Sequence, residues 1–302
     1  MILAGDVGGT KTRLAFYEKQ DSQMVCRAIE TYPSRDYSDI CAVLQAFLRQ
    51  HAFPVTRAAF GVPGPVVDGV ADMMVNLPWK VEESQLAAFL KIDKVKLVND
   101  LVATTASLPH LQPEKLLTLH PGEAAGPGER FAVLAPGTGL GQGFLFFDRN
   151  SGRYHVLASE GGHADFAPTN EIQTELFRYL RAKFSRVSYE RVLSGQGLVN
   201  IYEFLRECGK AEAPAELQQR LAQQDAAAVI SGSALTGEFK ICVMALDIFA
   251  AILGAQAGNL ALLLTATGGV YVGGGIAPKI CQKLADGTTV AAYLNKGRLS
   301  YR

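Results

Sequence analysis

The sequence predicts an α/β protein made of two similar domains, and three observations lead to this prediction. Stretches with strand-like alternation and stretches with helical spacing follow one another through the first hundred residues. A glycine-rich turn, "GDVGGTKT", occurs at residues 5–12, and a similar one, "PGTGLGQG", at residues 136–143. The rest of the second half carries mainly helical patterns, so the second domain should contain more helix than the first.

In the first domain, residues 2–5 and 12–17 predict two strands around a short loop, which form a hairpin. Residues 38–51 carry apolar side chains at helical spacing. Further along, the sequence predicts a strand from residue 57, a helix over 82–91, a strand over 94–100 and a helix over 101–108. This order is typical of an α/β domain.

A Gly/Pro-rich stretch, "LHPGEAAGPGER", breaks the composition before Phe131, where a second hairpin is predicted. With a constant shift of 131 residues, Leu3 falls on Leu134 and Gly8 on Gly139, which indicates an internal repeat. We therefore place a small α/β domain at residues 1–110 and a large domain at residues 111–302. Helices of the large domain are predicted at 170–184, 195–208, 214–229 and 234–266.

Composition restricts the function classes. The 302 residues are 48% hydrophobic, which is enough for a sizeable core, and the 29 basic residues balance the 29 acidic ones without a long basic run. A nucleic-acid partner is therefore not expected.

We recognise no signal peptide, and the five cysteines are far apart, as is typical of a reducing cytosol. Asp247, Gln256 and Asn259 interrupt the long apolar stretch 241–266, which favours a buried helix over a membrane span. We expect a cytoplasmic protein.

Glycine turns can expose successive backbone N–H groups to a phosphate. The first turn adds the hydroxyls of Thr10 and Thr12 and the ammonium of Lys11, and Asp6 is a carboxylate suited to holding Mg²⁺ through water. The second glycine of a P-loop is missing, since Thr10 stands there.

The Rossmann pattern also fails, because a strand and not a helix follows the turn at residues 137–139. The partner motifs of a protein-kinase glycine loop are absent from the sequence. A single glycine turn is most often only structural. Two such turns and a third glycine run at 273–275 favour phosphate binding.

A set of segments then carries a resemblance. In chain order they are "GDVGGTKTRLAF", "GVPGPV", "VNLPW", "LVNDLVA", "PGTGLG", "SEGGHADFAP", "YERVLSGQGL" and "VGGGIAPK". This set resembles the bacterial ATP-dependent glucokinases of the sugar kinase/Hsp70/actin superfamily and covers residues 1 to about 280. The resemblance implies a two-domain actin-like ATPase (ribonuclease H-like) fold, with a cleft between a small α/β domain and a larger α+β domain. It implies phosphoryl transfer from ATP, with Mg²⁺, to the 6-hydroxyl of glucose.

The resemblance also implies roles for individual residues. The first phosphate loop would be Asp6, Gly8, Gly9 and Thr10, with Asp6 holding Mg²⁺ through water. The second would be Gly137, Thr138 and Gly139, while Gly273, Gly274 and Gly275 would border the adenosine. Glucose would contact Asn99, Asp100, Glu160, His163 and Glu190, with Asp100 as the general base.

Two departures from the family pattern are visible. Glucokinases usually have Asn at the position of Lys11, whereas lysine is common there in the related ROK sugar kinases. The cysteine-rich zinc motif of ROK proteins, however, has no counterpart between His163 and Cys208. The chain ends at Arg302, before a strand and a helix that normally follow in the family. We therefore expect a small domain with incomplete packing.

Residue chemistry alone leaves alternatives open. Asp100 at a strand end is as well placed to cap the next helix as to act as a base. Glu160 and His163 beside two glycines suit sugar hydroxyls, yet such a pair is more often part of a polar loop. For Glu190, a helix cap or a salt bridge is the more common role of such a residue. Trp79 is expected in the core.

The rival functions are a kinase of another hexose or of an N-acetylated amino sugar, and an actin-like or chaperone-like ATPase with a protein partner. A non-catalytic sugar sensor would need a helix-turn-helix ahead of Gly5, for which the sequence has no room. A homodimer is expected.

Overall fold

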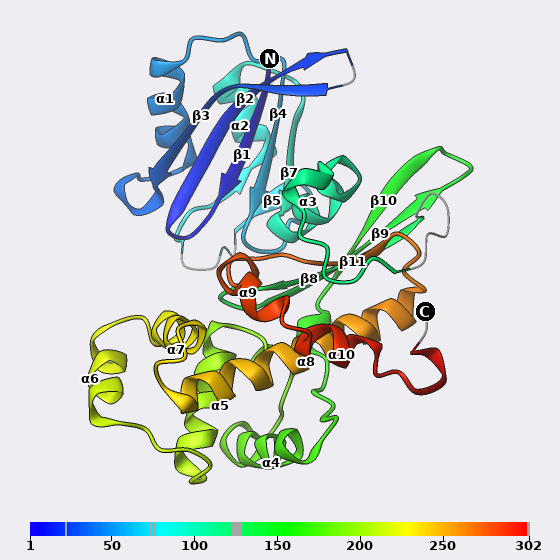
Figure 1. Cartoon of the computed structure of the whole chain (residues 1–302). Helices are drawn as coiled ribbons and strands as arrows, with labels where there is room; N and C mark the ends of the chain where they lie inside the picture. Colours follow the sequence, from blue (N-terminus) through cyan, green and yellow to red (C-terminus); the bar gives the residue numbers. More distant parts are fainter. Residues whose placement is uncertain (22, 73, 75–76, 123–128, 301–302) are drawn as a thin grey trace. The chain divides into compact units, whose positions relative to one another are not determined.

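The computed structural model describes the chain except residues 22, 73, 75–76, 123–128 and 301–302. Parts of the "VNLPW" and "LHPGEAAGPGER" stretches therefore lie outside the described residues. The chain divides into two compact units, an N-terminal unit (Met1–Thr104) and a C-terminal unit (Thr105–Arg302), shown in Figure 1. This division falls within helix α3 (Asp100–Ser107), whereas the sequence analysis places its domain boundary after residue 110.

The N-terminal unit is built on a five-stranded sheet of order β3-β2-β1-β4-β7. Its strands are β1 (Ile2–Val7), β2 (Lys11–Gln20), β3 (Gln23–Pro33), β4 (Arg57–Val62) and β7 (Val95–Asn99). The other elements are η1 (Ser34–Asp36), α1 (Ile40–Gln50), α2 (Glu83–Leu90) and the short pair β5 (Val70–Ala71) and β6 (Val81–Glu82). β1 runs antiparallel to β2 and parallel to β4, so the predicted hairpin forms the centre of the sheet.

Alternate residues of these strands form the core of the N-terminal unit. Leu3, Phe16 and Phe60 are fully buried on one face of the sheet, which α1 covers. The ring of Phe16 stacks on that of Phe47 from α1, with ring centroids 4.9 Å apart. Trp79 is 4% exposed, which confirms the prediction that it lies in the core.

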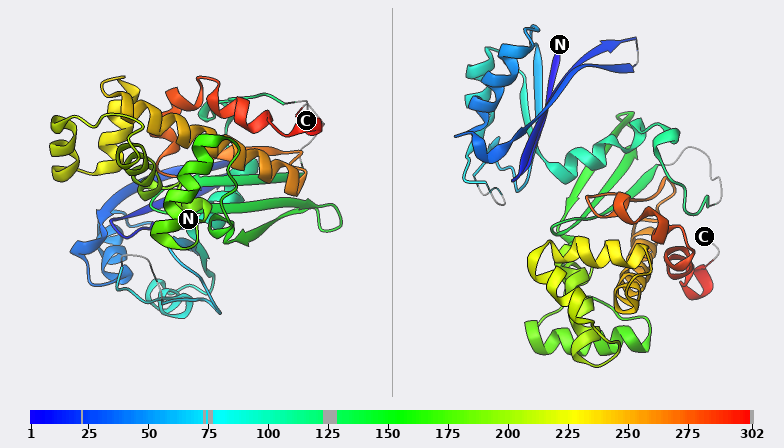
Figure 2. Two further views of the ribbon diagram at one scale, coloured as in Figure 1. Left: turned by 90° about the horizontal axis from the view of Figure 1, so that it is seen from below. Right: turned by 60° about the vertical axis from the view of Figure 1, so that its left-hand side comes forward.

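The C-terminal unit contains a four-stranded sheet of order β10-β9-β8-β11. Its strands are β8 (Arg130–Pro136), β9 (Leu140–Asp148), β10 (Arg153–Ser159) and β11 (Gly269–Val272). Its α-helices are α4 (Glu171–Phe184), α5 (Gly195–Glu207), α6 (Ala215–Gln223), α7 (Ala226–Leu235), α8 (Lys240–Leu264), α9 (Cys281–Leu284) and α10 (Thr288–Leu294). The 3₁₀ turns are η2 (Leu108–His110), η3 (Pro113–Lys115), η4 (Gly161–His163), η5 (Tyr189–Arg191), η6 (Ala277–Ile280) and η7 (Gly297–Leu299). Helices α5, α7 and α8 pack against one another (Figure 2).

The two sheets share one strand order. β3-β2-β1-β4 and β10-β9-β8-β11 each consist of three antiparallel strands followed by a parallel one. The strands that precede the two turns end at Val7 and at Pro136, a shift of 129, so the shift of 131 inferred from residue types is two residues too large. The two hairpins differ in turn length, since Val7 pairs with Thr12 across four residues and Pro136 pairs with Leu140 across three.

Several predicted elements differ from the structure. The helix expected over 214–229 is two helices, because the carboxylate of Asp225 accepts a hydrogen bond from the backbone N–H of Ala228 and starts α7 there. The helix expected from residue 234 begins only at Lys240. Strands β3 and β10 were not predicted. Both are edge strands with many exposed residues, so their composition lacks the apolar signal of a central strand.

Helix α8 is the long apolar segment that the sequence analysis assigned to the core. By length and composition it passes for a membrane span, but 72% of its most apolar window is buried inside the C-terminal unit. Its side chains pack in the core of that unit with α5 and α7, which agrees with the prediction of a buried helix.

Two glycines on α8 allow α10 to approach closely. A Cβ at Gly254 would overlap the carbonyl of Thr289, and one at Gly258 would overlap the carbonyl of Tyr293, 2.5 Å away. Gly254 and Gly258 are four residues apart and so lie on the same face of the helix. They form the seam against which α10 packs.

We expect Gly254→Ala to lower the free energy of unfolding by about 1–3 kcal/mol, because the added methyl overpacks the α8–α10 seam. Denaturant titration measures the change. The matched control is Gly232→Ala, in the interior of α7, where a Cβ meets nothing within 4 Å. That variant should be as stable as the wild type, or more stable by up to about 1 kcal/mol, because alanine favours helix. Equal effects of the two substitutions would contradict the packing argument.

Candidate active site

The first glycine turn connects the two central strands of the N-terminal unit. The backbone N–H of Gly8 donates to the carbonyl of Lys11 at 3.0 Å and closes the turn. Asp6 is exposed near the end of β1, where it pairs with Arg13 across the hairpin. Gly9 is half-buried and Thr10 is exposed, so both remain open to a ligand.

Ser34 supports this turn and was not predicted from the sequence. Its hydroxyl donates to the carbonyl of Gly8 at 2.7 Å and lies 3.0 Å from the hydroxyl of Thr12. Its backbone N–H donates to the carbonyl of Thr10 at 3.0 Å. Thr12 is fully buried, so its hydroxyl, which the sequence analysis offered to a phosphate, instead bonds with Ser34 and stabilises the turn. Ser34 lies 22 residues from Thr12 in the chain, so no local sequence pattern indicates that the two hydroxyls are in contact.

Asn99 and Asp100 stand where β7 passes into α3. The side-chain oxygen of Asn99 accepts hydrogen bonds from the backbone N–H groups of Leu101, at 3.0 Å, and Val102, at 3.3 Å. Its amide donates to the carbonyl of Gly64 at 3.1 Å. Asn99 therefore caps α3 with two hydrogen bonds. The capping role that the sequence analysis left open for Asp100 is filled mainly by Asn99.

The carboxylate of Asp100 accepts a hydrogen bond from the backbone N–H of Leu101 at 2.8 Å. Solvent still reaches the side chain, but surrounding protein atoms displace part of its hydration, which raises the pKa of Asp100 above that of an ordinary aspartate. The hydrogen bond from Leu101 lowers this pKa in part, and the negative charge of Asp6 raises it further. Asp100 is thus a carboxylate with increased proton affinity at the end of a parallel strand, near a second carboxylate.

The second glycine turn lies next to the third glycine run inside the C-terminal unit. The carbonyl of Gly137 accepts from the backbone N–H of Gly195, at the start of α5, at 2.9 Å. The backbone N–H of Gly273 donates to the carbonyl of Leu134 at 2.9 Å, and Gly274 takes a φ of +77° against the backbone of Pro136. The structure therefore brings together two glycine runs that are more than 130 residues apart in the chain.

Glu190 joins the second glycine turn to the loop that contains His163. Its carboxylate accepts the backbone N–H of Leu140 at 3.0 Å, and its other oxygen lies 4.0 Å from Nδ1 of His163. A Cβ at Gly139 would stand 2.5 Å from the Glu190 carboxylate, so only glycine leaves room for this contact. Glu160 is exposed, and its carbonyl accepts the backbone N–H of His163 at 3.0 Å. Glu160, His163 and Glu190 therefore belong to one neighbourhood of this unit.

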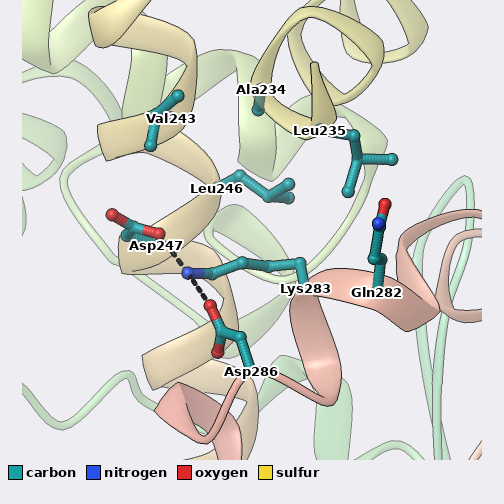
Figure 3. Close-up of a pocket in the computed structure, with 8 residues that line it drawn as sticks. All are labelled: Ala234, Leu235, Val243, Leu246, Asp247, Gln282, Lys283 and Asp286. Carbon is teal, nitrogen blue, oxygen red and sulfur yellow. Dashed lines mark hydrogen bonds and ion pairs between the residues drawn. The ribbon is translucent and has the colours of Figure 1, made fainter. Parts of the chain in front are cut away.

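Two hollows in the described part of the chain lie away from the predicted site residues. A hollow of about 210 Å³ between α7, α8 and α9 is lined by apolar side chains and by Lys283, whose ammonium pairs with Asp247 and, at 2.6 Å, with Asp286 (Figure 3). Because two carboxylates already satisfy this lysine, the hollow offers no free positive charge. Neither it nor the hollow at the start of β1 contains a predicted site residue. No cluster of three metal-ligating side chains occurs among the residues that the structure describes.

The predicted site residues thus form two groups, one in each unit. Asp6, Gly8, Gly9, Thr10, Asn99 and Asp100 belong to the N-terminal unit, at the ends of β1 and β7. Gly137, Thr138, Gly139, Glu160, His163, Glu190, Gly273, Gly274 and Gly275 belong to the C-terminal unit.

Comparison with solved structures defines the class of protein. A glucokinase from an Antarctic psychrotroph superposes with a TM-score of 0.86 at 30% identity, covering 99% of this chain and 90% of the other. A ROK family glucokinase from Streptomyces griseus, solved with glucose and AMPPNP, has a TM-score of 0.62 at 18% identity over 99% of this chain and 91% of the other, and shows a shared fold. The chain is therefore a sugar kinase of the actin-like ATPase fold.

Sequence comparison identifies the family within this class. The family model described as Glucokinase matches residues 3–301. The glucokinase of Nostoc sp. is 40% identical over 315 residues, covering 99% of this chain and 91% of the relative, and that of Colwellia psychrerythraea is 36% identical over 99% and 88%. The chain belongs to the glucokinase family of ATP-dependent hexose kinases, as the resemblance predicted.

We expect Gly139→Ala to weaken glucose binding about tenfold or more, because the added methyl displaces the Glu190 carboxylate from the N–H of Leu140, and a hydrogen bond to a charged group is lost. Calorimetric titration with glucose measures the loss. The control is Gly195→Ala, where a Cβ makes only ordinary contacts and the N–H to Gly137 is kept. Wild-type affinity in Gly139→Ala would show that Glu190 does not contact the sugar.

Proposed function

We propose that the protein is a glucokinase that transfers the γ-phosphoryl group of ATP to the 6-hydroxyl of glucose and releases glucose 6-phosphate and ADP. The observation that carries the proposal is Asp100, a carboxylate of raised pKa at the end of β7, in a chain that matches the glucokinase family over residues 3–301. Phosphoryl transfer requires positioned phosphates and a group that accepts the proton of the attacking hydroxyl. Asp100 is suited to the second requirement.

The nucleotide would lie against the three glycine runs. Gly8, Gly9 and Thr10 would present backbone N–H groups and a hydroxyl to the phosphates, and Gly137, Thr138 and Gly139 would do the same from the C-terminal unit. Gly273, Gly274 and Gly275 would border the adenosine. The neighbourhood of Gly137 and the Gly273 run supports this division, because backbone free of side chains leaves space for a ligand.

The sugar would be read by polar side chains of both units. Glu160, His163 and Glu190 would contact hydroxyls from the C-terminal unit, and Asn99 and Asp100 from the N-terminal unit. The amide of Asn99 is already held by Gly64 and by the start of α3, so its position is fixed before a sugar arrives.

A divalent cation fits the N-terminal group. Asp6 lies close enough to Asp100 for its charge to raise the pKa of Asp100, and two neighbouring carboxylates form a donor set that Mg²⁺ prefers. Asp6 would hold Mg²⁺ through water, where the ion supplies neutralisation of phosphate charge.

In the reaction, the Asp100 carboxylate accepts the proton of the sugar 6-hydroxyl as that oxygen bonds to the γ-phosphorus. The bond from the γ-phosphorus to the bridging oxygen breaks, and that oxygen leaves with ADP. The hydrogen bond from Leu101 keeps the Asp100 carboxylate oriented during the proton transfer.

We further propose that the protein acts in the cytoplasm as a homodimer. The free cysteines at positions 26, 41, 208, 242 and 281 support a reducing compartment. Light scattering of the purified chain tests the dimer.

We expect glucose to be phosphorylated and galactose and fructose to be poor substrates, with slow ATP hydrolysis in the absence of sugar. Polar groups that lose water on binding need partners, so a site of this kind rejects a sugar with an inverted hydroxyl by about 10⁴–10⁵-fold. ATP consumption with each sugar, and with none, is the measurement. Preference for an N-acetylated sugar would instead identify a ROK-type amino-sugar kinase, and rapid hydrolysis without sugar would identify a chaperone-like ATPase.

We expect Asp100→Asn to lower kcat by about 10²–10⁴-fold while ATP affinity and folding are retained, because the amide cannot accept the proton. In the wild type, kcat should fall as the pH falls through the pKa of Asp100, which lies above that of an ordinary aspartate, since the protonated acid is no base. A pH series of both proteins gives the test. Near-wild-type turnover in Asp100→Asn would refute the role.

A further inference from the structure

A partly buried lysine near the end of the chain is held without an acidic partner. Nζ of Lys296 donates to the carbonyl of Ala255 at 2.9 Å and to the side-chain oxygen of Asn259 at 2.8 Å, both on α8. Among the described residues, no carboxylate lies within 4.0 Å of this ammonium. Burial lowers the pKa of Lys296, which reflects the cost of placing the charge there.

The alkyl chain of Lys296 passes over Gly258, where a Cβ would collide with it. The close α8–α10 seam therefore carries this ammonium to Asn259. Burial makes the charge of this lysine costly, so its hydrogen bonds to Ala255 and Asn259 are needed to hold it there.

Asn259 connects Lys296 with Tyr189. Its amide donates to the hydroxyl of Tyr189 at 3.1 Å and to the side-chain oxygen of Gln256 at 3.0 Å. Because Lys296 occupies the side-chain oxygen of Asn259, the amide group is oriented with its N–H bonds toward Tyr189 and Gln256. Lys296 thus determines which way Asn259 faces.

Tyr189 is 5% exposed and precedes Glu190 directly. Its backbone N–H donates to the carbonyl of Ala164 at 2.9 Å, one residue after His163, and its ring packs edge-on against Phe166 with centroids 5.8 Å apart. Hydrogen bonds from the backbone of Ala167 and from Asn259 reach the hydroxyl and partly offset the rise in the pKa of Tyr189 that burial causes. Tyr189 therefore ties the Glu190 turn to the His163 loop.

We propose that Lys296 and Asn259 are positioning residues that act through Tyr189 to hold Glu190 and His163 in place for the sugar. The ammonium orients Asn259, Asn259 anchors the tyrosine hydroxyl, and the tyrosine backbone sets the distance between the two sugar-contacting segments. The effect on sugar affinity rests on the proposed function, but the chain of contacts does not.

The test uses Lys296→Met, which keeps the alkyl chain over Gly258 and removes the ammonium, together with Tyr189→Phe and the double variant. We expect each single substitution to raise the KM for glucose about three- to tenfold, the range for losing one or two hydrogen bonds, with the KM for ATP changed less than twofold. The double variant should show no more than the larger single effect, because both substitutions interrupt one chain of contacts.

The matched control is Lys283→Met, another partly buried lysine of the same unit, which pairs with Asp247 and Asp286 (Figure 3). It should lower the melting temperature and leave the KM for glucose unchanged. A wild-type KM for glucose in Lys296→Met, with only the melting temperature lowered, would overturn the proposal, as would multiplication of the two single effects in the double variant.

Hydrogen exchange separates this inference from the proposed function. If the wild type does not phosphorylate glucose, the proposed function fails, and exchange of the backbone amides of residues 188–193 and of Leu140 still decides the inference. Faster exchange in Lys296→Met than in both the wild type and Lys283→Met supports it. Unchanged exchange overturns it, whatever the substrate.

Discussion

The hydrogen bond from the backbone N–H of Leu140 to the Glu190 carboxylate is the contact on which the candidate site of the C-terminal unit depends. It connects the turn of a hairpin with a 3₁₀ segment 50 residues later and places a carboxylate beside His163. The contact exists because Gly139 has no side chain. The space at Gly139 therefore connects the glycine turn proposed to bind phosphate with Glu190, which is proposed to bind the sugar.

The glycine turn of the N-terminal unit is also held by long-range hydrogen bonds, but other side chains make them. The hydroxyl of Ser34 bonds with the carbonyl of Gly8 in this turn and with the buried hydroxyl of Thr12. The carboxylates of Asp6 and Asp100 lie at the ends of strands β1 and β7. Each turn lies at the centre of a sheet with the order of three antiparallel strands and one parallel strand. The central strands are the best supported on both sides, so each sheet offers a rigid frame for a turn whose own residues contribute little packing.

Support for the site extends well away from the residues that would touch a ligand. The small residues of α8 bring α10 close, and this places Lys296 where it orients Asn259 and, through it, Tyr189. Buried polar groups of this kind are stable only when each has a partner, so the chain of contacts also limits the arrangements that the loop of His163 and the turn of Glu190 can adopt. The packing of α8 against α10 and the orientation of Glu190, the carboxylate proposed to contact the sugar, are in this way connected.

The sequence by itself determined the features that depend on near neighbours along the chain. Alternating apolar residues predicted β1, β2, β4 and β7, helical spacing predicted α1, α2 and α4, and the glycine turns marked the two hairpins. The sequence motifs indicated the family, and the resemblance to that family indicated which residues would form the site. Local patterns do not mark edge strands, so β3 and β10 were missed, and residue types alone misplaced the repeat by two positions.

Only the tertiary structure decided which side chains support the site and which remain open. Thr12 and Ser34 meet across 22 residues, Glu190 and Leu140 across 50, and Asn259 and Tyr189 across 70. The burial of the Thr12 hydroxyl, the room at Gly139 and the orientation of Asn259 by Lys296 all result from these long-range contacts. They depend on how sheets and helices pack, and a pattern of neighbouring residues contains no information on which distant backbone group will fill a given space.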